Sequence, residues 1–217
     1  MQTKIEAVLW DFGGVITSSP FDAFNRFESE RGFPENTIRR INAANPDGNA
    51  WALFERAEID SVQFDALFAA EAAVLGHDIR GAEVLALLSG DIRPAVVAAL
   101  GLCKTAGLKI GCITNNVQTG HGTGMAGSTE KAVAIAAIMA LFDAVIESSK
   151  AGVRKPDPRI YQMMCEMLSV SPQNCVYLDD LGINCKPAAA LGMTAIKVEN
   201  ERQALDALSQ IIGISFG

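Results

Sequence analysis

From residue 91 onward, short apolar segments of the sequence alternate with segments of helical pattern. Strands that alternate with helices in this way favour a parallel sheet with helices on both of its faces. Residues 5–10 form one more short apolar segment, which we expect to be a strand of the same sheet. The predicted fold class is therefore α/β, with a doubly wound parallel sheet. The other predicted strands are residues 109–114, 143–147, 175–178 and 194–198, and the predicted helices are residues 94–107, 132–142, 157–168, 184–191 and 201–212.

Residues 17–90 interrupt this alternation. They keep a helical pattern with polar breaks and contain no convincing strand. Ser19-Pro20 predicts the first helix of the block, because serine favours the N-cap and proline the first helical position. We therefore expect a core domain formed by residues 1–16 and 91–217, with a helical cap domain, residues 17–90, inserted after the first strand. A helical block in that place would make a natural lid over a site at the strand end.

The composition indicates a globular protein with an acidic surface. The 217 residues are 49% hydrophobic and 20% charged, and the formal net charge is -7. Binding to nucleic acid requires a basic face, so we expect no nucleic-acid partner. The longest apolar run is too short to cross a bilayer, and we expect no membrane span.

The cysteines point to a reducing environment. Five cysteines and two histidines are present. The cysteines show no CxxC or other close pairing, which argues against a zinc site. We expect five reduced, mostly buried thiols, as in a cytosolic protein. The first predicted strand begins within a few residues of the N-terminus, so we expect no signal peptide and a cytoplasmic location.

Several side chains suited to phosphoryl transfer fall at or just after the predicted strand ends. In an open α/β sheet, that edge is where ligands bind. One carboxylate can attack phosphorus, and further carboxylates can hold Mg²⁺, a hard cation that prefers oxygen ligands. A lysine and a hydroxyl can bind the transferring phosphoryl oxygens. Each residue alone has an ordinary explanation as a turn or surface residue, but the set predicts a phosphoryl-transfer site. Its members are Asp11, Thr114 with Asn115, Lys155, and the pair Asp179-Asp180.

With these residues in place, the sequence resembles the haloacid dehalogenase superfamily. The resemblance covers the whole predicted core. It is closest to the branch that contains the N-terminal phosphatase domain of soluble epoxide hydrolase and a related domain fused to an acyl-CoA dehydrogenase. The matching motifs are Asp11-Phe12-Gly13-Gly14-Val15-Ile16, Ile113-Thr114-Asn115-Asn116, Lys155-Pro156-Asp157-Pro158 with Arg159-Ile160-Tyr161, and Tyr177-Leu178-Asp179-Asp180-Leu181-Gly182.

The resemblance implies a doubly wound core, a helical cap, Mg²⁺ and hydrolysis of small phosphorylated metabolites through an aspartyl phosphate. It makes Asp11 the nucleophile and a metal ligand. It adds the backbone carbonyl of Gly13 and the carboxylates of Asp180 and Asp179 to the metal site. The implied phosphate-binding residues are Thr114, Asn115 and Lys155, the last of them counted with Asp11 as catalytic.

Gly13 departs from the family pattern, which has a second aspartate at that position. That aspartate protonates the leaving alcohol and then activates water, which is worth roughly 10²–10⁴-fold in rate. Three outcomes are open. The protein is a slow phosphatase or one suited to good leaving groups, or it takes its acid or base from the cap or the substrate, or it is an inactive module that binds a phosphorylated ligand. The Gly13 carbonyl remains able to bind metal in each case.

Two other chemistries of the superfamily also lack that aspartate. The dehalogenases need no metal and have no acidic pair in the fourth motif, so Asp179-Asp180 argues against them. The phosphonoacetaldehyde hydrolases use a lysine of the cap, and no lysine lies between Lys4 and Lys104. Both alternatives are therefore disfavoured.

Four further features receive ordinary interpretations. Residues 122–127 match GxGxxG, but no strand runs directly into the first glycine, so we expect a loop rather than a dinucleotide site. His121 of that loop is a weak candidate for the missing acid or base. We expect a surface salt bridge along its helix for Arg56. Arg154 either adds positive charge near the phosphate or lies at the surface.

Overall fold

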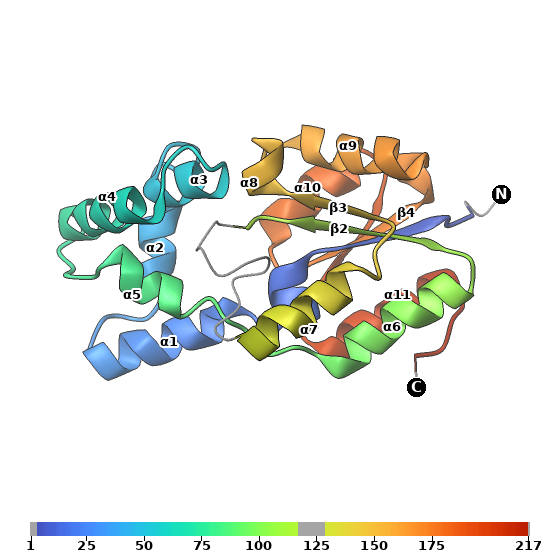
Figure 1. Cartoon of the computed structure of the whole chain (residues 1–217), viewed down its shortest axis with the longest axis horizontal. Helices are drawn as coiled ribbons and strands as arrows, with labels where there is room; N and C mark the ends of the chain where they lie inside the picture. Colours follow the sequence, from blue (N-terminus) through green and yellow to red (C-terminus); the bar gives the residue numbers. More distant parts are fainter. Residues whose placement is uncertain (1–3, 117–128, 217) are drawn as a thin grey trace.

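The structure is a computed structural model that describes residues 4–116 and 129–216 (Figure 1). The GxGxxG segment and His121 lie outside the described residues. The sequence folds into a five-stranded sheet in the order β3-β2-β1-β4-β5, and every pair of neighbours is parallel. The α/β prediction is confirmed. The strands are β1 (Ala7–Trp10), β2 (Lys109–Thr114), β3 (Ala144–Glu147), β4 (Cys175–Asp179) and β5 (Thr194–Lys197).

Both faces of the sheet are buried, as the uninterrupted apolar character of its strands predicts. Successive residues of a strand point to opposite faces. In β1, Val8 and Trp10 therefore enter one hydrophobic cluster, and Ala7 and Leu9 enter the other. Figure 1 shows the helices in two layers, one on each side of the strands. The first layer contains α6 (Pro94–Thr105), α7 (Thr129–Met139) and α11 (Glu201–Ile212), and the second contains α9 (Pro158–Leu168) and α10 (Gly182–Ala190).

Five further helices pack around a third cluster of their own, beside the sheet (Figure 1). The first of them begins as expected, with Pro20 at its first position and the Ser19 hydroxyl accepting a hydrogen bond from the backbone N–H of Phe21. Aromatic rings fill the cluster, and those of Phe54 and Phe64 stack at 4.8 Å between centroids. The helical prediction for this block is confirmed. We call these the cap helices: α1 (Pro20–Arg31), α2 (Thr37–Ala43), α3 (Ala50–Glu55), α4 (Ser61–Val74) and α5 (Gly81–Ala86).

The chain enters and leaves the cap helices through two segments that lie side by side. Thr17 and Ile92 form an isolated antiparallel bridge. Next to it, the Ser18 N–H donates to the Asp91 carbonyl at 2.7 Å. The entering segment follows directly on the turn η1 (Phe12–Ile16) after β1. The cap helices are consequently attached beside the carboxyl end of β1.

The sequence misplaces some element boundaries by a few residues and misses one short helix. β1 begins at Ala7, and α7 covers Thr129–Met139 rather than residues 132–142. The polar first turn of α7 carries no apolar signal, which explains the shifted start. The missed helix is α8 (Ser148–Ala151), a single turn after β3. Within the described ranges, no helix is long and apolar enough to cross a membrane.

Candidate active site

The ends of three strands bring the predicted residues to one edge of the sheet. Trp10 pairs with Cys112 on one side and with Leu178 on the other. Asp11 therefore follows β1 at the level where β2 ends in Thr114 and β4 ends in Asp179. Parallel strands make this convergence unavoidable, because all of their carboxyl ends lie at the same edge.

The turn after Asp11 depends on two glycines in different ways. Gly14 has a φ of 77°, and a Cβ placed on it would lie 2.2 Å from Oδ2 of Asp180. Gly14 is thus required both by its backbone conformation and by the close approach of Asp180. Gly13 has a φ of -70°. Apart from Gly13 itself and its two chain neighbours, no described residue has an atom within 4 Å of the Cβ position of Gly13, so a side chain fits there.

Lys155 reaches the site from a loop and not, as the sequence suggested, from a strand end. It lies beyond β3 and α8, and its backbone is held by the side chain of Asn115. The Lys155 N–H donates to Oδ1 of Asn115 at 2.8 Å, and Nδ2 of Asn115 donates to the Lys155 carbonyl at 3.0 Å. The Lys155 side chain is 1% exposed, with Nζ 2.8 Å from Oδ1 of Asp11 and 2.7 Å from Oδ2 of Asp179.

Asp179 and Asp180 have different surroundings. Asp179 is fully buried, and both of its oxygens accept hydrogen bonds. The donors are the Lys155 ammonium, the Tyr177 hydroxyl, the Leu181 N–H at 2.8 Å and Nδ2 of Asn184 at 3.0 and 3.1 Å. Asp180 follows the strand, and its Oδ2 accepts a hydrogen bond from the Ser19 hydroxyl at 3.0 Å.

The site holds more negative than positive charge. Oxygens of Asp11, Asp179 and Asp180 lie within 4.8 Å of one another. Burial raises the pKa of Asp11 well above its usual value, although Lys155 opposes the shift. Burial, with a further contribution from Asp179, raises the pKa of Asp180 to about 6. Burial lowers the pKa of Lys155, but Asp11 and Asp179 together outweigh it and keep this ammonium charged.

These charges fit a bound divalent cation. Three carboxylates and one ammonium leave an excess of two negative charges when all are ionised. The donor atoms in this group are carboxylate oxygens, which suit a hard cation such as Mg²⁺. Asp11 and Asp180 are better placed as ligands than Asp179, because the oxygens of Asp179 already accept from four donors.

The two remaining predicted residues lie at the end of β2. Thr114 is the last residue of the strand and is buried. The side chain of Asn115 binds the Lys155 backbone, and its Nδ2 also donates to Oε2 of Glu55 at 3.2 Å. The structure therefore places Thr114, Asn115 and Lys155 in one neighbourhood, with the Asn115 amide engaged in protein contacts.

Sequence reasoning missed Glu55, the last residue of α3. The neighbouring Arg56 drew attention instead; it forms a salt bridge as expected, 2.6 Å from Glu58, but beyond the end of α3 rather than along the helix. Arg154 pairs with Glu55 at 2.7 Å, a contact that neither of its two expected roles included. The sequence does not indicate that Glu55 is buried. Glu55 and Arg56 are adjacent residues of opposite charge, and only packing decides which of them faces the core.

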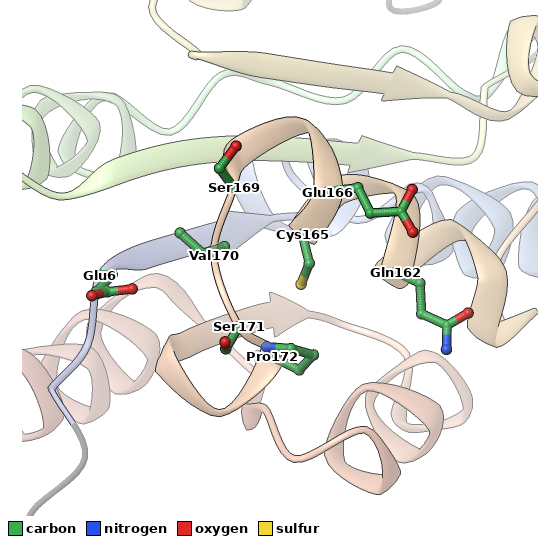
Figure 2. Close-up of a pocket in the computed structure, with 8 residues that line it drawn as sticks. All are labelled: Glu6, Gln162, Cys165, Glu166, Ser169, Val170, Ser171 and Pro172. Atoms are coloured by element: carbon green, nitrogen blue, oxygen red, sulfur yellow. The ribbon is translucent and has the colours of Figure 1, made fainter.

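A separate surface pocket of about 640 Å³ lies away from this site (Figure 2). It forms where β1 begins and α9 ends, whereas the carboxylates lie where the strands end. It is therefore not part of the candidate active site. Its lining residues are Glu6, Gln162, Cys165, Glu166, Ser169, Val170, Ser171 and Pro172.

The two glycines provide a matched test of this geometry. We expect Gly14→Ala to destabilise the fold by about 2 kcal/mol or more, through left-handed strain and displacement of Asp180. Gly13→Ala should change stability by less than about 1 kcal/mol, because its backbone is ordinary and its Cβ meets open space. Urea denaturation followed by circular dichroism measures both. Equal losses in the two variants would contradict the close packing of Asp180 on Gly14.

Comparison with known proteins agrees with the fold. A model of the haloacid dehalogenase-like hydrolases matches residues 5–192. The chain is 33% identical over 217 residues to the phosphatase MT3486 of Mycobacterium tuberculosis (strain CDC 1551 / Oshkosh), covering 94% of this chain and 91% of that one. It is 30% identical over 212 residues to the mouse acyl-CoA dehydrogenase family member 10. That match covers 95% of this chain but only 19% of the mouse protein.

A solved structure shares the fold. It is a HAD family enzyme of Bacteroides thetaiotaomicron in complex with magnesium and inorganic phosphate, with a TM-score of 0.57 and 16% identity. The match covers 90% of this chain and 94% of that one. Both the family model and the relatives span nearly the whole sheet and the cap helices. The chain belongs to the haloacid dehalogenase-like hydrolases.

Proposed function

We propose that this hydrolase is a Mg²⁺-dependent phosphatase that cleaves small organic phosphomonoesters through an aspartyl phosphate on Asp11. The observation that carries the proposal is the contact of Asp11 with a buried lysine, 2.8 Å away, beside two more carboxylates at the strand ends. The phosphatase name of the mycobacterial relative supports it. Magnesium and phosphate in the Bacteroides fold neighbour are compatible with it.

In the first step, Asp11 attacks phosphorus and the alcohol leaves. The Lys155 ammonium offsets the negative charge of the phosphoryl oxygens as they pass to Asp11, and the Thr114 hydroxyl binds one of them. Asn115 contributes to phosphate binding through its backbone N–H, because its amide side chain holds the Lys155 backbone. Water then hydrolyses the aspartyl phosphate.

Gly13 supplies no proton in either step. An alcohol of low pKa leaves as its anion, with the electron pair of the broken P–O bond, and needs no proton, so the arrangement suits good leaving groups. A substrate that carries its own acidic group satisfies the same need. The open space at the Cβ position of Gly13 is available to such a group or to water.

Asp11, Asp180 and the Gly13 carbonyl are the proposed metal ligands. Bound Mg²⁺ would supply positive charge at the phosphoryl oxygens and favour the ionised forms of the two carboxylates. Asp179, by contrast, positions Lys155 through the 2.7 Å contact between them. This division departs from the expectation that Asp179 joins Asp180 at the metal.

The domain division predicted from the sequence remains part of the proposal. In it, residues 1–16 and 91–217 form the catalytic core, and residues 17–90 form a cap that excludes water during phosphoryl transfer. The paired linker segments at Thr17 and Ile92 would serve as the hinge.

The direct test replaces the nucleophile. Asp11→Asn keeps the size of the side chain but removes the attacking carboxylate, so turnover of an aryl phosphate in Mg²⁺ should fall by at least about 10³-fold. Steady-state release of the phenolate measures this. Wild-type turnover in the variant would refute the proposal. Wild-type protein that traps beryllium fluoride yet turns over no member of a broad phosphate panel would be a binding module instead.

A second prediction concerns the missing acid. Gly13→Asp places a carboxylate in open space, and turnover should rise by about 10-fold or more for alkyl phosphates, whose leaving groups need a proton. Aryl phosphates with acidic phenols should gain little. Gly13→Asn, of equal size and without acid–base capacity, is the control. An equal gain with Asn, or no gain with Asp, would show that proton transfer at this position does not limit the rate.

The two adjacent aspartates should separate into two roles. Asp180→Asn should weaken Mg²⁺ binding by about 10-fold or more and leave stability nearly unchanged. Asp179→Asn should instead lower stability by about 3 kcal/mol, because the NH2 of the new amide faces the hydrogen-bond donors from which Asp179 accepts. Isothermal titration calorimetry and urea denaturation measure the two effects. A stable Asp179→Asn variant that has lost Mg²⁺ binding would restore Asp179 as a ligand.

A further inference from the structure

Glu55 is a buried carboxylate of the cap helices that the proposed chemistry does not use. It is 6% exposed, and it lies at the carboxyl end of α3, where the cap helices meet the sheet domain. Within the cap helices it accepts a hydrogen bond at Oε1 from the Trp51 indole, at 2.8 Å. The other polar contacts that the structure describes for its side chain, and that of its carbonyl, are to residues outside the cap helices.

Three contacts join Glu55 to segments around Lys155. Oε2 lies 2.7 Å from Nε of Arg154 and accepts from Nδ2 of Asn115 at 3.2 Å. The backbone carbonyl of Glu55 accepts from the Ser148 hydroxyl at 2.7 Å. One residue of α3 thus touches the end of β2, the start of α8 and the loop that carries the lysine.

Two of these contacts act on Lys155 itself. Arg154 precedes it in the chain, and Asn115 binds its backbone N–H and carbonyl. The backbone of Lys155 therefore adjoins both Arg154 and Asn115, and each of these two residues contacts the Glu55 carboxylate. Loss of the Glu55 carboxylate would remove one partner from each of these two groups, which adjoin the residue whose ammonium bridges Asp11 and Asp179.

We propose that Glu55 is a positioning residue through which the docked cap holds Lys155 in its place beside Asp11. The inference deepens the proposed function and rests on it for the role of Lys155. Its structural part, the coupling of a cap residue to the Lys155 loop, does not depend on catalysis. Arg154 completes the contact, because it is the cationic partner of Glu55.

Glu58 offers a matched control. It is a glutamate of the same segment, it also pairs with an arginine, and its pair with Arg56 lies at the surface of the cap helices. Glu58→Ala therefore removes a charge and an ion pair without touching the Lys155 loop. Glu55→Ala removes the proposed connection, and Glu55→Gln keeps its shape and its carbonyl acceptor.

Hydrogen exchange of the peptide that covers residues 148–156 tests the connection without any substrate. Glu55→Ala should speed exchange there by about 10-fold or more, Glu55→Gln by less, and Glu58→Ala should match the wild type. Equal exchange in Glu55→Ala and Glu58→Ala would overturn the inference. This outcome is independent of whether the protein turns over any phosphate.

Kinetics tests the positioning role. Glu55→Ala should lower kcat for an aryl phosphate by as much as about 100-fold while KM changes by less than about 5-fold, because a displaced lysine weakens transition-state contacts first. Glu55→Gln should recover part of the loss. Faster exchange with unchanged kcat would reduce Glu55 to a structural contact and overturn the inference. Absence of turnover in the wild type would instead refute the proposed function.

Discussion

The site at the strand ends depends on a buried ammonium that lies between two carboxylates. Lys155 is almost inaccessible to water, and its contacts with Asp11 and Asp179 make its charge tolerable there. Those carboxylates sit at the ends of β1 and β4, neighbours in the sheet, so the lysine joins two strands that are far apart in the sequence. The loop that carries it must then be held from outside, which Asn115 does through the Lys155 backbone.

The same constraint separates the roles of adjacent residues. Asp179 still belongs to β4, so it faces the same side of the sheet as Tyr177, two residues earlier, and receives its hydroxyl. Asp180 lies beyond the strand and packs on Gly14, where any side chain would collide with it. Asp179 is consequently engaged with the lysine, and Asp180 remains available for a cation. Burial raises the pKa of Asp11 and of Asp180, and the neighbouring charge of Asp179 adds to both shifts.

Local patterns predicted the fold class, since apolar strands, proline starts and serine caps act over a few residues. They also identified Asp11 and the acidic pair, because turns after parallel strands converge. The order of the strands and the route of Lys155 depend on packing between distant segments, which no local pattern contains. Glu55 was missed for the same reason. A glutamate next to an arginine at a helix end is an ordinary surface sequence, and only the docking of α3 on α8 buries one of the two.

The fold does not need a glycine at position 13, which the sequence alone could not show. Its Cβ position is open, its φ is ordinary, and the neighbouring turn is held by Gly14 and not by Gly13. Folding therefore does not require glycine at this position, and an aspartate would fit. Because packing does not require the glycine, the missing side chain matters for the chemistry. It leaves space that a substrate group or water can occupy. In the proposed function, Asp11 attacks while residue 13 offers no acidic side chain, so the proton for the leaving alcohol must come from another part of the protein, from the substrate or from water.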